Sequence, residues 1–430
     1  DIQQQEPVEI SELETTENND LSKSSESITV DESIAEDILA TQADTAVVVG
    51  TVSDYLTAKG DAKLYNINLP AGVYLQAQLT TPANADLDYD LYLLDAEGNI
   101  LTGSDYYTYI NGTAGTLPEA LGYITSGDTA TYYLYVLASE GGSVSESFTL
   151  DYSVSTACDS YEIDESVRQA LAFTYGAGGA YIESRNLSSP IDNDWYVITV
   201  PSSRIYDKLK ISATTASTNT CSVEVYQNVA SEGYQMKRVG SGNTISVSSG
   251  KYYIRVSNAK TMENFDDLDI QNYKLSITPI LKATGIVITD LKGSEGLNKV
   301  VNYPGYGAHF RTQGSGTLTV YGVLTATDSS TGVTYAVGGE QINGLYYSPA
   351  WEANNTSANA IRRGTGTTDS SGKFEIDISL PPGIGVYSYY GSTSTHYFDI
   401  CGVSVSPSDD SSISASETIF HLAYTMYHPF

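Results

Sequence analysis

The sequence predicts an all-β protein with three β-sandwich domains in tandem, preceded by a disordered acidic segment. Two observations predict this fold class. The chain combines 37 glycines with long Ser/Thr-rich runs that alternate with the two-residue period of half-buried strands. One such run, Asp192–Pro201, recurs in weaker form as Asp61–Pro70, which indicates two related modules. The length of 430 residues fits about two to four domains.

Residues 1–48 are predicted to be a disordered acidic tether. They hold thirteen acidic residues and a single base, Lys23, without any aromatic residue, glycine or cysteine. Such a segment cannot bury enough apolar surface to offset the entropy lost on ordering it.

The first module is expected at residues 49–156 and the second at residues 157–280. Both contain the repeated run, which ends at a proline, and both carry a second matching run, Thr131–Val136 or Lys251–Val256. Alternation predicts that one face of each run lies in the core. These core residues are Tyr65, Ile67, Leu69, Tyr132, Leu134 and Val136 in the first module, and Tyr196, Ile198, Val200, Tyr252, Ile254 and Val256 in the second.

Residues 281–430 are expected to form the third sandwich. Gly316–Leu324 alternates as a strand, and Thr368–Ile378 is a turn that leads into another alternating strand. The Asp369-x-x-Gly372-x-Phe374 turn is similar to those of immunoglobulin-like and transthyretin-like surface modules. The predicted fold class is therefore a series of jelly-roll or immunoglobulin-like sandwiches.

The second module resembles a bacterial pre-peptidase C-terminal (PPC) domain. The resemblance rests on the acidic opening Asp159–Glu165, the run Asp192–Tyr196, and the strands Gly250–Val256 and Tyr273–Ile277. The opening departs from the family's pattern, with Ile163-Asp164-Glu165 in place of Pro-Asn-Asp after the glutamate. The first module resembles the family more weakly. Members are small sandwiches that usually accompany secreted bacterial peptidases, so the resemblance implies a secreted or cell-surface protein.

A calcium site is implied by a more distant resemblance of the second module to the collagen-binding domains of clostridial collagenases. In those domains the acidic opening and the Asp-x-Asp before the first aromatic strand hold calcium. Calcium binds six to eight oxygens, which carboxylates from two segments can largely supply. The candidate ligands by position are Glu162, Asp164, Glu165, Asp192 and Asp194. The alternative is that these acids are solvated.

Asp86, Asp88 and Asp90 of the first module also alternate along one strand. Alternate residues of a regular strand lie roughly 6.6 Å apart, so their carboxylates do not converge without a bulge. We expect a solvated strand face here.

Two aromatic surfaces are candidates for ligand binding. The first is the outward face of the two related modules, with Tyr133, Tyr135, Tyr253 and Arg255. The second is the expected long loop from Gly344 to Gly366, with Tyr346, Tyr347, Trp351, Arg362 and Arg363. Packing between strands or modules, or of the loop on its own domain, is the alternative for each.

The composition restricts the function. The net charge of −31 disfavours nucleic acid and anionic membranes as partners, and no apolar run is long enough to insert in a bilayer. The four histidines lie in no metal or catalytic motif, and there is no nucleophile elbow. Of the three cysteines, Cys158 and Cys221 could pair.

These observations favour a non-catalytic, secreted or cell-surface bacterial protein that binds or adheres to an extracellular protein or a polysaccharide. The alternatives are a carbohydrate-binding or accessory subunit of a secreted hydrolase, and a structural spacer. The sequence does not specify an oligomeric state.

Overall fold

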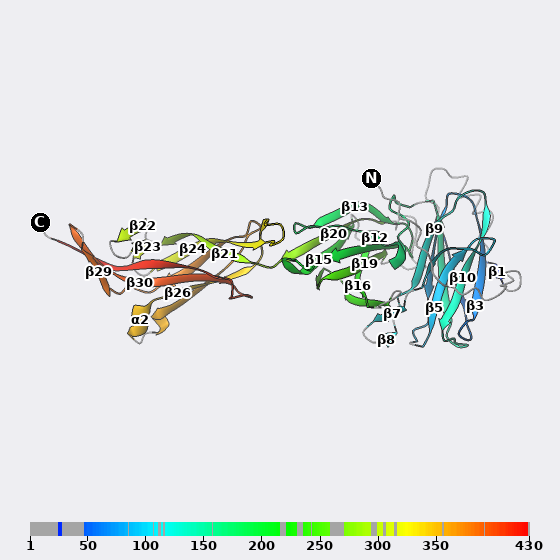
Figure 1. Ribbon diagram of the computed structural model, residues 1–430, viewed down its shortest axis with the longest axis horizontal. Coiled ribbons are helices and arrows are strands. Elements are labelled where there is room, and N and C mark those ends of the chain that lie inside the picture. The colour runs from blue at the N-terminus through cyan, green and yellow to red at the C-terminus, as the bar shows by residue number, and fades with distance from the viewer. Residues whose placement is uncertain are drawn as a thin grey trace.

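The chain folds into three β-sandwiches, which confirms the predicted fold class. Figure 1 shows them in chain order along the long axis of the molecule. The computed structural model describes residues 25–27, 47–84, 86–105, 107–110, 113–114, 117–156, 158–215, 221–229, 235–241, 243–258, 271–293, 299–303, 307–313, 316–354, 357–390 and 392–428. No helix in these ranges is long and apolar enough to cross a membrane.

Most of the expected tether, residues 1–24 and 28–46, lies outside the described residues. Three residues of it, Ser25–Ser27, form strand β1 and pair with β3 of the first module in parallel. Val47 and Val48 at its end already belong to strand β2 (Val47–Asp54), so the prediction of disorder is wrong for these five residues.

The first module consists of two facing sheets, with its core between them. One sheet has the order β1, β3 (Ala62–Leu69), β10 (Ala130–Glu140), β5 (Asp88–Leu94) and β6 (Ile100–Ser104). The other has the order β2 (Val47–Asp54), β11 (Phe148–Ser155), β4 (Tyr74–Thr80) and β9 (Glu119–Ile124).

The second module repeats this arrangement. One sheet has the order β12 (Leu171–Ala172), β14 (Asn193–Val200), β19 (Gly250–Asn258), β16 (Cys221–Asn228), β17 (Gln235–Ser241), β7 (Tyr107–Ile110) and β8 (Thr113–Ala114). The other has the order β13 (Ala180–Leu187), β20 (Gln271–Leu281), β15 (Tyr206–Thr215) and β18 (Thr244–Ser246). A 3₁₀ turn, η1, spans Val167–Gln169.

The repeat extends to strand register. Tyr65 lies opposite Leu134 in the first module, and Tyr196 lies opposite Ile254 in the second. All twelve residues expected in the two cores are buried there. Cys158 and Cys221 form no disulfide with each other.

The first and second modules share an interface. Strand β7 belongs to the first module in sequence, yet it pairs with β17 at the edge of the second module's sheet (Figure 1). A small apolar cluster forms beside it and joins Leu117 of the first module to Val167, Ala170, Trp195, Tyr226, Met236 and Tyr253 of the second. This interface between the two modules, which we call the junction, is therefore packed.

The third module has a small sheet and a large one. The small sheet contains β21 (Gly285–Gly293), β24 (Gly316–Thr327), β25 (Thr334–Ala336) and β28 (Lys373–Leu380). The large one contains β22 (Lys299–Tyr303), β23 (Gly307–Gln313), β31 (Ala415–Tyr427), β30 (Ser394–Pro407), β26 (Gln341–Tyr347) and β27 (Ile361–Thr367), with β29 (Tyr387–Tyr390) paired to β30. Helices α2 (Pro349–Ala353) and α3 (Ser357–Ala360) connect β26 to β27.

The outer face of β5 is less solvated than expected, because Asp90 is buried. Its carboxylate accepts hydrogen bonds from the hydroxyl groups of Ser139 and Tyr92. Burial raises the pKa of Asp88 to about 7 and that of Asp90 to about 6. The expectation of a solvated face is therefore wrong for Asp90.

We predict that Asp88→Asn stabilises the first module at alkaline pH. The folded pKa of Asp88 lies above its unfolded value, so its favourable contribution is complete below about pH 4 and is lost as pH rises through about 7. The melting temperature at pH 8 should rise by about 4 °C or more, which corresponds to about 1 kcal/mol for a domain of this size. The gain should shrink at pH 5.

Asp86→Asn is the matched control, since Asp86 is exposed just before the same strand. Thermal melts of both variants at pH 5 and pH 8 check the prediction. Equal shifts in the two variants, or a gain that does not depend on pH, would contradict it.

Candidate metal centre

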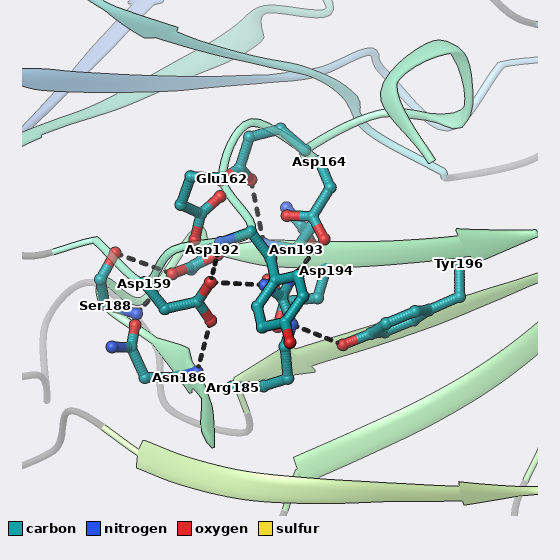
Figure 2. A network of polar contacts seen from close by, with 12 residues as sticks. Asp159, Glu162, Asp164, Arg185, Asn186, Ser188, Asp192, Asn193, Asp194 and Tyr196 are labelled. Carbon is teal, nitrogen blue, oxygen red and sulfur yellow. Dashed lines mark hydrogen bonds and ion pairs between the residues drawn. The ribbon is translucent and has the colours of Figure 1, made fainter. Parts of the chain in front are cut away.

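The acidic residues of the second module meet in a buried polar network at the junction (Figure 2). The loop before η1 supplies Asp159, Glu162, Asp164 and Glu165. Asp192 directly precedes β14, and Asp194 lies at its start. Asp164, Glu165, Asp192 and Asp194 are each at most 1% exposed. Carboxylates at this depth need partners, because burial disfavours their charge.

One partner is Arg185, which a bulge in β13 directs inward. The pairing of β13 with β20 shifts register between Ile182 and Arg185, and Ser184 has a positive φ of 62°. A bulge of this kind re-aims the side chain that follows it. Arg185 is consequently completely buried, although arginine is seldom buried without partners.

The Arg185 guanidinium neutralises one part of the network. It forms ion pairs with Asp159 and Asp164, and with Asp194 Oδ1 at 3.1 Å. Its Nε donates to the Tyr196 hydroxyl at 2.7 Å (Figure 2), and the Tyr273 hydroxyl donates to Asp194. These three carboxylates therefore share a cation supplied by the chain.

A second part consists of Glu162, Glu165 and Asp192. Ligand atoms of these three residues all lie within 4.8 Å of one another, and the same holds for Glu162, Asp164 and Asp194. Glu165 accepts hydrogen bonds from the Asn193 backbone at 3.0 Å and from two side chains of the first module, Tyr74 and Gln76.

Asp192 also closes a local turn. Its Oδ2 accepts hydrogen bonds from the backbone amide and the hydroxyl group of Ser188, the latter at 2.8 Å. Its other oxygen, Oδ1, is buried without a hydrogen-bond donor. Glu162 Oε1 and Asp164 Oδ1 are likewise buried without a hydrogen-bond donor.

The pKa values of these carboxyl groups reflect the shortage of hydrogen-bond donors. Burial raises the pKa of Glu162 to about 8, and the negative charge of Asp192 adds to the rise. Burial and Asp192 also raise the pKa of Glu165 well above its usual range. Without a further cation, protons must neutralise part of this group near neutral pH.

The residues present therefore fit a hard divalent cation. Calcium takes carboxylate and carbonyl oxygens, and buried oxygens without donors are the atoms that such an ion would satisfy. The described acidic groups could hold a metal ion. The group of Glu162, Glu165 and Asp192 is the better fit, because Arg185 already pairs with Asp164 and Asp194.

The structure brings together all five predicted ligands, Glu162, Asp164, Glu165, Asp192 and Asp194, but in two groups. Sequence reasoning missed the partners of these carboxylates, among them Arg185, Tyr74 and Gln76. A lone arginine in an alternating run gives no sign that a bulge turns it inward. The hydrophobic periodicity of the sequence does not indicate which face of the first module is covered by the second module.

The first predicted ligand surface is partly covered. Tyr253 is 8% exposed and lies in the apolar cluster of the junction, so it cannot stack on a ligand. Arg255 is half-buried and donates to Asn193 at 2.7 Å and to Glu224 at 3.3 Å. Tyr133 and Tyr135 stay half-buried on the outer face of β10, where the Tyr135 ring packs against Tyr92.

The second predicted surface is not a long loop. The stretch from Gly344 to Gly366 is a hairpin of β26 and β27, closed by α2 and α3. Tyr346 is completely buried and bonds to Cys401 and His421, so it is unavailable to a ligand.

The other four residues of that surface have separate surroundings. The Tyr347 hydroxyl donates to Glu352, the Trp351 indole donates to the carbonyl of Pro382 at 2.9 Å, and Arg362 donates to Asn359 at 2.7 Å. Arg363 is exposed.

Comparison with known proteins assigns no family. No protein-family model matches the chain. An uncharacterized protein of Bacillus subtilis (strain 168), YlqB, is 36% identical over 74 residues, which are 17% of this chain and 46% of that protein. The chain thus spans about half the length of this curated relative.

Among solved structures, the similarities are remote. The periplasmic g-type lysozyme inhibitor PliG of Aeromonas hydrophila is 11% identical with a TM-score of 0.18, over 30% of this chain and 96% of that one. The tandem CBM22 domains of Paenibacillus barcinonensis Xyn10C are 10% identical with a TM-score of 0.15, over 55% of this chain and 91% of that one. Similarities this low carry no inference about function.

Proposed function

We propose that this chain is a non-catalytic binding protein of the bacterial cell exterior, built on calcium-binding PPC-like modules, and that it recognises a neutral polysaccharide. The observation that supports a binding role is a surface at the end of the third module that lies away from the first two modules (Figure 1). The buried acidic network supports the calcium site. Its carboxylates are too deeply buried to reach a polymeric substrate, so a structural ion suits them better than catalysis.

The binding surface lies on the ribbon of β29, the start of β30 and the end of β31, which we call the tip ribbon. It projects from the third module at the end of the molecule opposite the first module (Figure 1). Several of its side chains are large, apolar and exposed: Val386 55%, Tyr387 41%, Tyr390 70%, Tyr424 49%, Met426 54% and Tyr427 77%. An exposed patch of this kind typically marks an interaction site.

Strand pairing sorts these side chains onto two faces. Tyr390 lies opposite Thr395, which lies opposite Met426, and Tyr397 lies opposite Tyr424. Because paired residues point to the same side, Tyr390, Tyr424 and Met426 share one face. The Tyr424 ring is stacked on Tyr397, with centroids 4.4 Å apart, and this contact holds it against the sheet.

The chemistry of the tip ribbon favours an uncharged ligand. Residues 386–398 and 423–428 contain no acidic residue, lysine or arginine, although the whole chain carries a net charge of −31. Tyrosine combines an apolar ring with a hydroxyl group, so it can both stack on a sugar ring and hydrogen-bond to it. A charged partner would find no complementary group here.

The calcium site predicts a thermal shift. Adding about 5 mM Ca²⁺ to chelator-treated protein should raise the melting temperature by about 5 °C or more, because an ion that binds only the folded state stabilises it. Glu162→Gln removes one charge from the group. It should melt higher than the natural protein in EDTA and show a smaller shift with calcium.

Asp207→Asn is the control for a lost acidic charge elsewhere in the module, because Asp207 is exposed. It should keep the full calcium shift. Identical melting of the natural protein in calcium and in EDTA would sink the calcium site.

The proposed role of the tip ribbon predicts that removing its aromatic rings weakens polysaccharide binding. Tyr390→Ala combined with Tyr424→Ala should reduce binding to a neutral polysaccharide about tenfold or more, because it removes two exposed rings from one face. Melting should change little, since both side chains are about half exposed or more. Retention on affinity gels cast with neutral polysaccharides measures the effect.

Tyr55→Ala, at a 43% exposed tyrosine of the first module, is the matched control and should bind normally. An array of glycans and extracellular-matrix proteins separates the alternatives. Binding to a matrix protein would show that the ligand is a protein and not a polysaccharide. Absence of all binding would favour the alternative of a structural spacer.

A further inference from the structure

Strand β4 of the first module presents a row of polar side chains to the second module. Tyr74, Gln76 and Gln78 alternate along it, while Leu75 and Leu79 between and beside them lie in the module's own core. Tyr74 and Gln76 are each only 1% exposed. This face of β4 is therefore buried in the junction.

These side chains contact the metal-binding group directly. The Tyr74 hydroxyl donates to Glu162 Oε2 at 2.8 Å and also to Glu165. The Gln76 amide nitrogen donates to Glu165 Oε1 at 2.7 Å. Burial raises the pKa of Asp192, and the neighbouring Ser188 and Gln76 side chains oppose that rise, so Gln76 also lies near Asp192.

The two modules approach each other closely at this point. A Cβ atom added to Gly122, in the neighbouring strand β9, would lie 2.7 Å from Glu165 Cγ and 2.8 Å from the Tyr74 hydroxyl. Only glycine allows this approach. The first module is thus part of the wall around Glu162, Glu165 and Asp192.

Gln76 carries the main observation. Its amide oxygen, Oε1, is buried and accepts no hydrogen bond, although the amide nitrogen of the same group is well used. Glu162 Oε1 and Asp192 Oδ1 also lack donors. Each such oxygen destabilises the folded protein if nothing satisfies it. Here the unsatisfied oxygens come from both modules.

We propose that the cation at Glu162, Glu165 and Asp192 is also bound by Gln76 Oε1, so that one divalent ion joins the first module to the second. This inference rests on the proposed calcium site and adds a ligand from the other module. An amide oxygen is a common calcium ligand beside carboxylates. The ion then controls how firmly the two modules are held together.

The junction has other contacts that persist without the ion. Strand β7 pairs with β17, Leu117 joins the apolar cluster, and Arg168 forms an ion pair with Asp105. Loss of the ion should therefore weaken the coupling of the modules and leave each of them folded. In calcium the two modules should unfold together, and in chelator they should unfold separately.

The test compares Gln76→Leu with Gln78→Leu in the full chain. Both changes remove an amide of the same size from β4, but the hydrogen bond that Gln78 accepts across the junction comes from Asn193, at 3.2 Å. Titration calorimetry with Ca²⁺ should show an affinity weakened about tenfold or more in Gln76→Leu and nearly unchanged in Gln78→Leu. Gln76→Glu, which keeps a ligand oxygen, should retain binding.

Scanning calorimetry gives the second readout. The joint transition of the first two modules in calcium should split in EDTA and in Gln76→Leu, but not in Gln78→Leu. Normal calcium affinity in Gln76→Leu would overturn the shared site and leave a calcium site confined to the second module. If the natural protein takes up no Ca²⁺ at pH 7.5, protons neutralise the group, and both the calcium site and the shared ion are wrong.

Discussion

The burial of several carboxylates around a single arginine is the constraint on which the junction depends. Removing a carboxylate from water is unfavourable unless a cation or hydrogen-bond donors replace the water. Arg185 does this for Asp159, Asp164 and Asp194. It pairs with neither Glu165 nor Asp192, so the second group depends on donors from the first module and on protons or the proposed cation. This requirement couples the two sandwiches.

The coupling explains why two modules with the same strand order serve different purposes. The outer face of the first module's β10 stays at the surface, half-buried, whereas the corresponding face of β19 lies against the junction with Tyr253 in its apolar cluster. The first two modules enclose the acidic network. The uncharged tip ribbon is an exposed aromatic surface at the opposite end of the molecule (Figure 1). The buried charge and the proposed recognition surface thus lie in different parts of the molecule.

Much of the fold could be predicted from the sequence, because a two-residue period states which side chains of a strand face the core. Tyr65, Tyr196 and the residues alternating with them are buried as that period requires. The candidate site was predictable only in part. The family resemblance of the acidic runs implied Glu162 and Asp192, but Arg185 depends on a bulge, and Gln76 depends on contact between modules. Neither feature leaves a periodic signal in a single sequence.

The repeat itself shows how the same position acquires a new role. Asp61 of the first module corresponds to Asp192, and its Oδ2 accepts hydrogen bonds from the amide and hydroxyl groups of Thr57, four residues earlier. Asp192 does the same with Ser188, also four residues earlier. The aspartate is therefore first a device that closes a turn, and both modules need it for that reason.

What differs is the surroundings of the other carboxylate oxygen. The hydrogen bonds of Asp61 lie at the surface, where water can satisfy its remaining oxygen, and Lys63, the counterpart of Asp194, pairs with Asp54. Asp192 Oδ1 is sealed in the junction without a donor. In the proposed site, a turn residue becomes a cation ligand because a neighbouring module excludes water from it. Such a site would follow from the packing of two repeats, and an isolated copy of either module would lack it in this form.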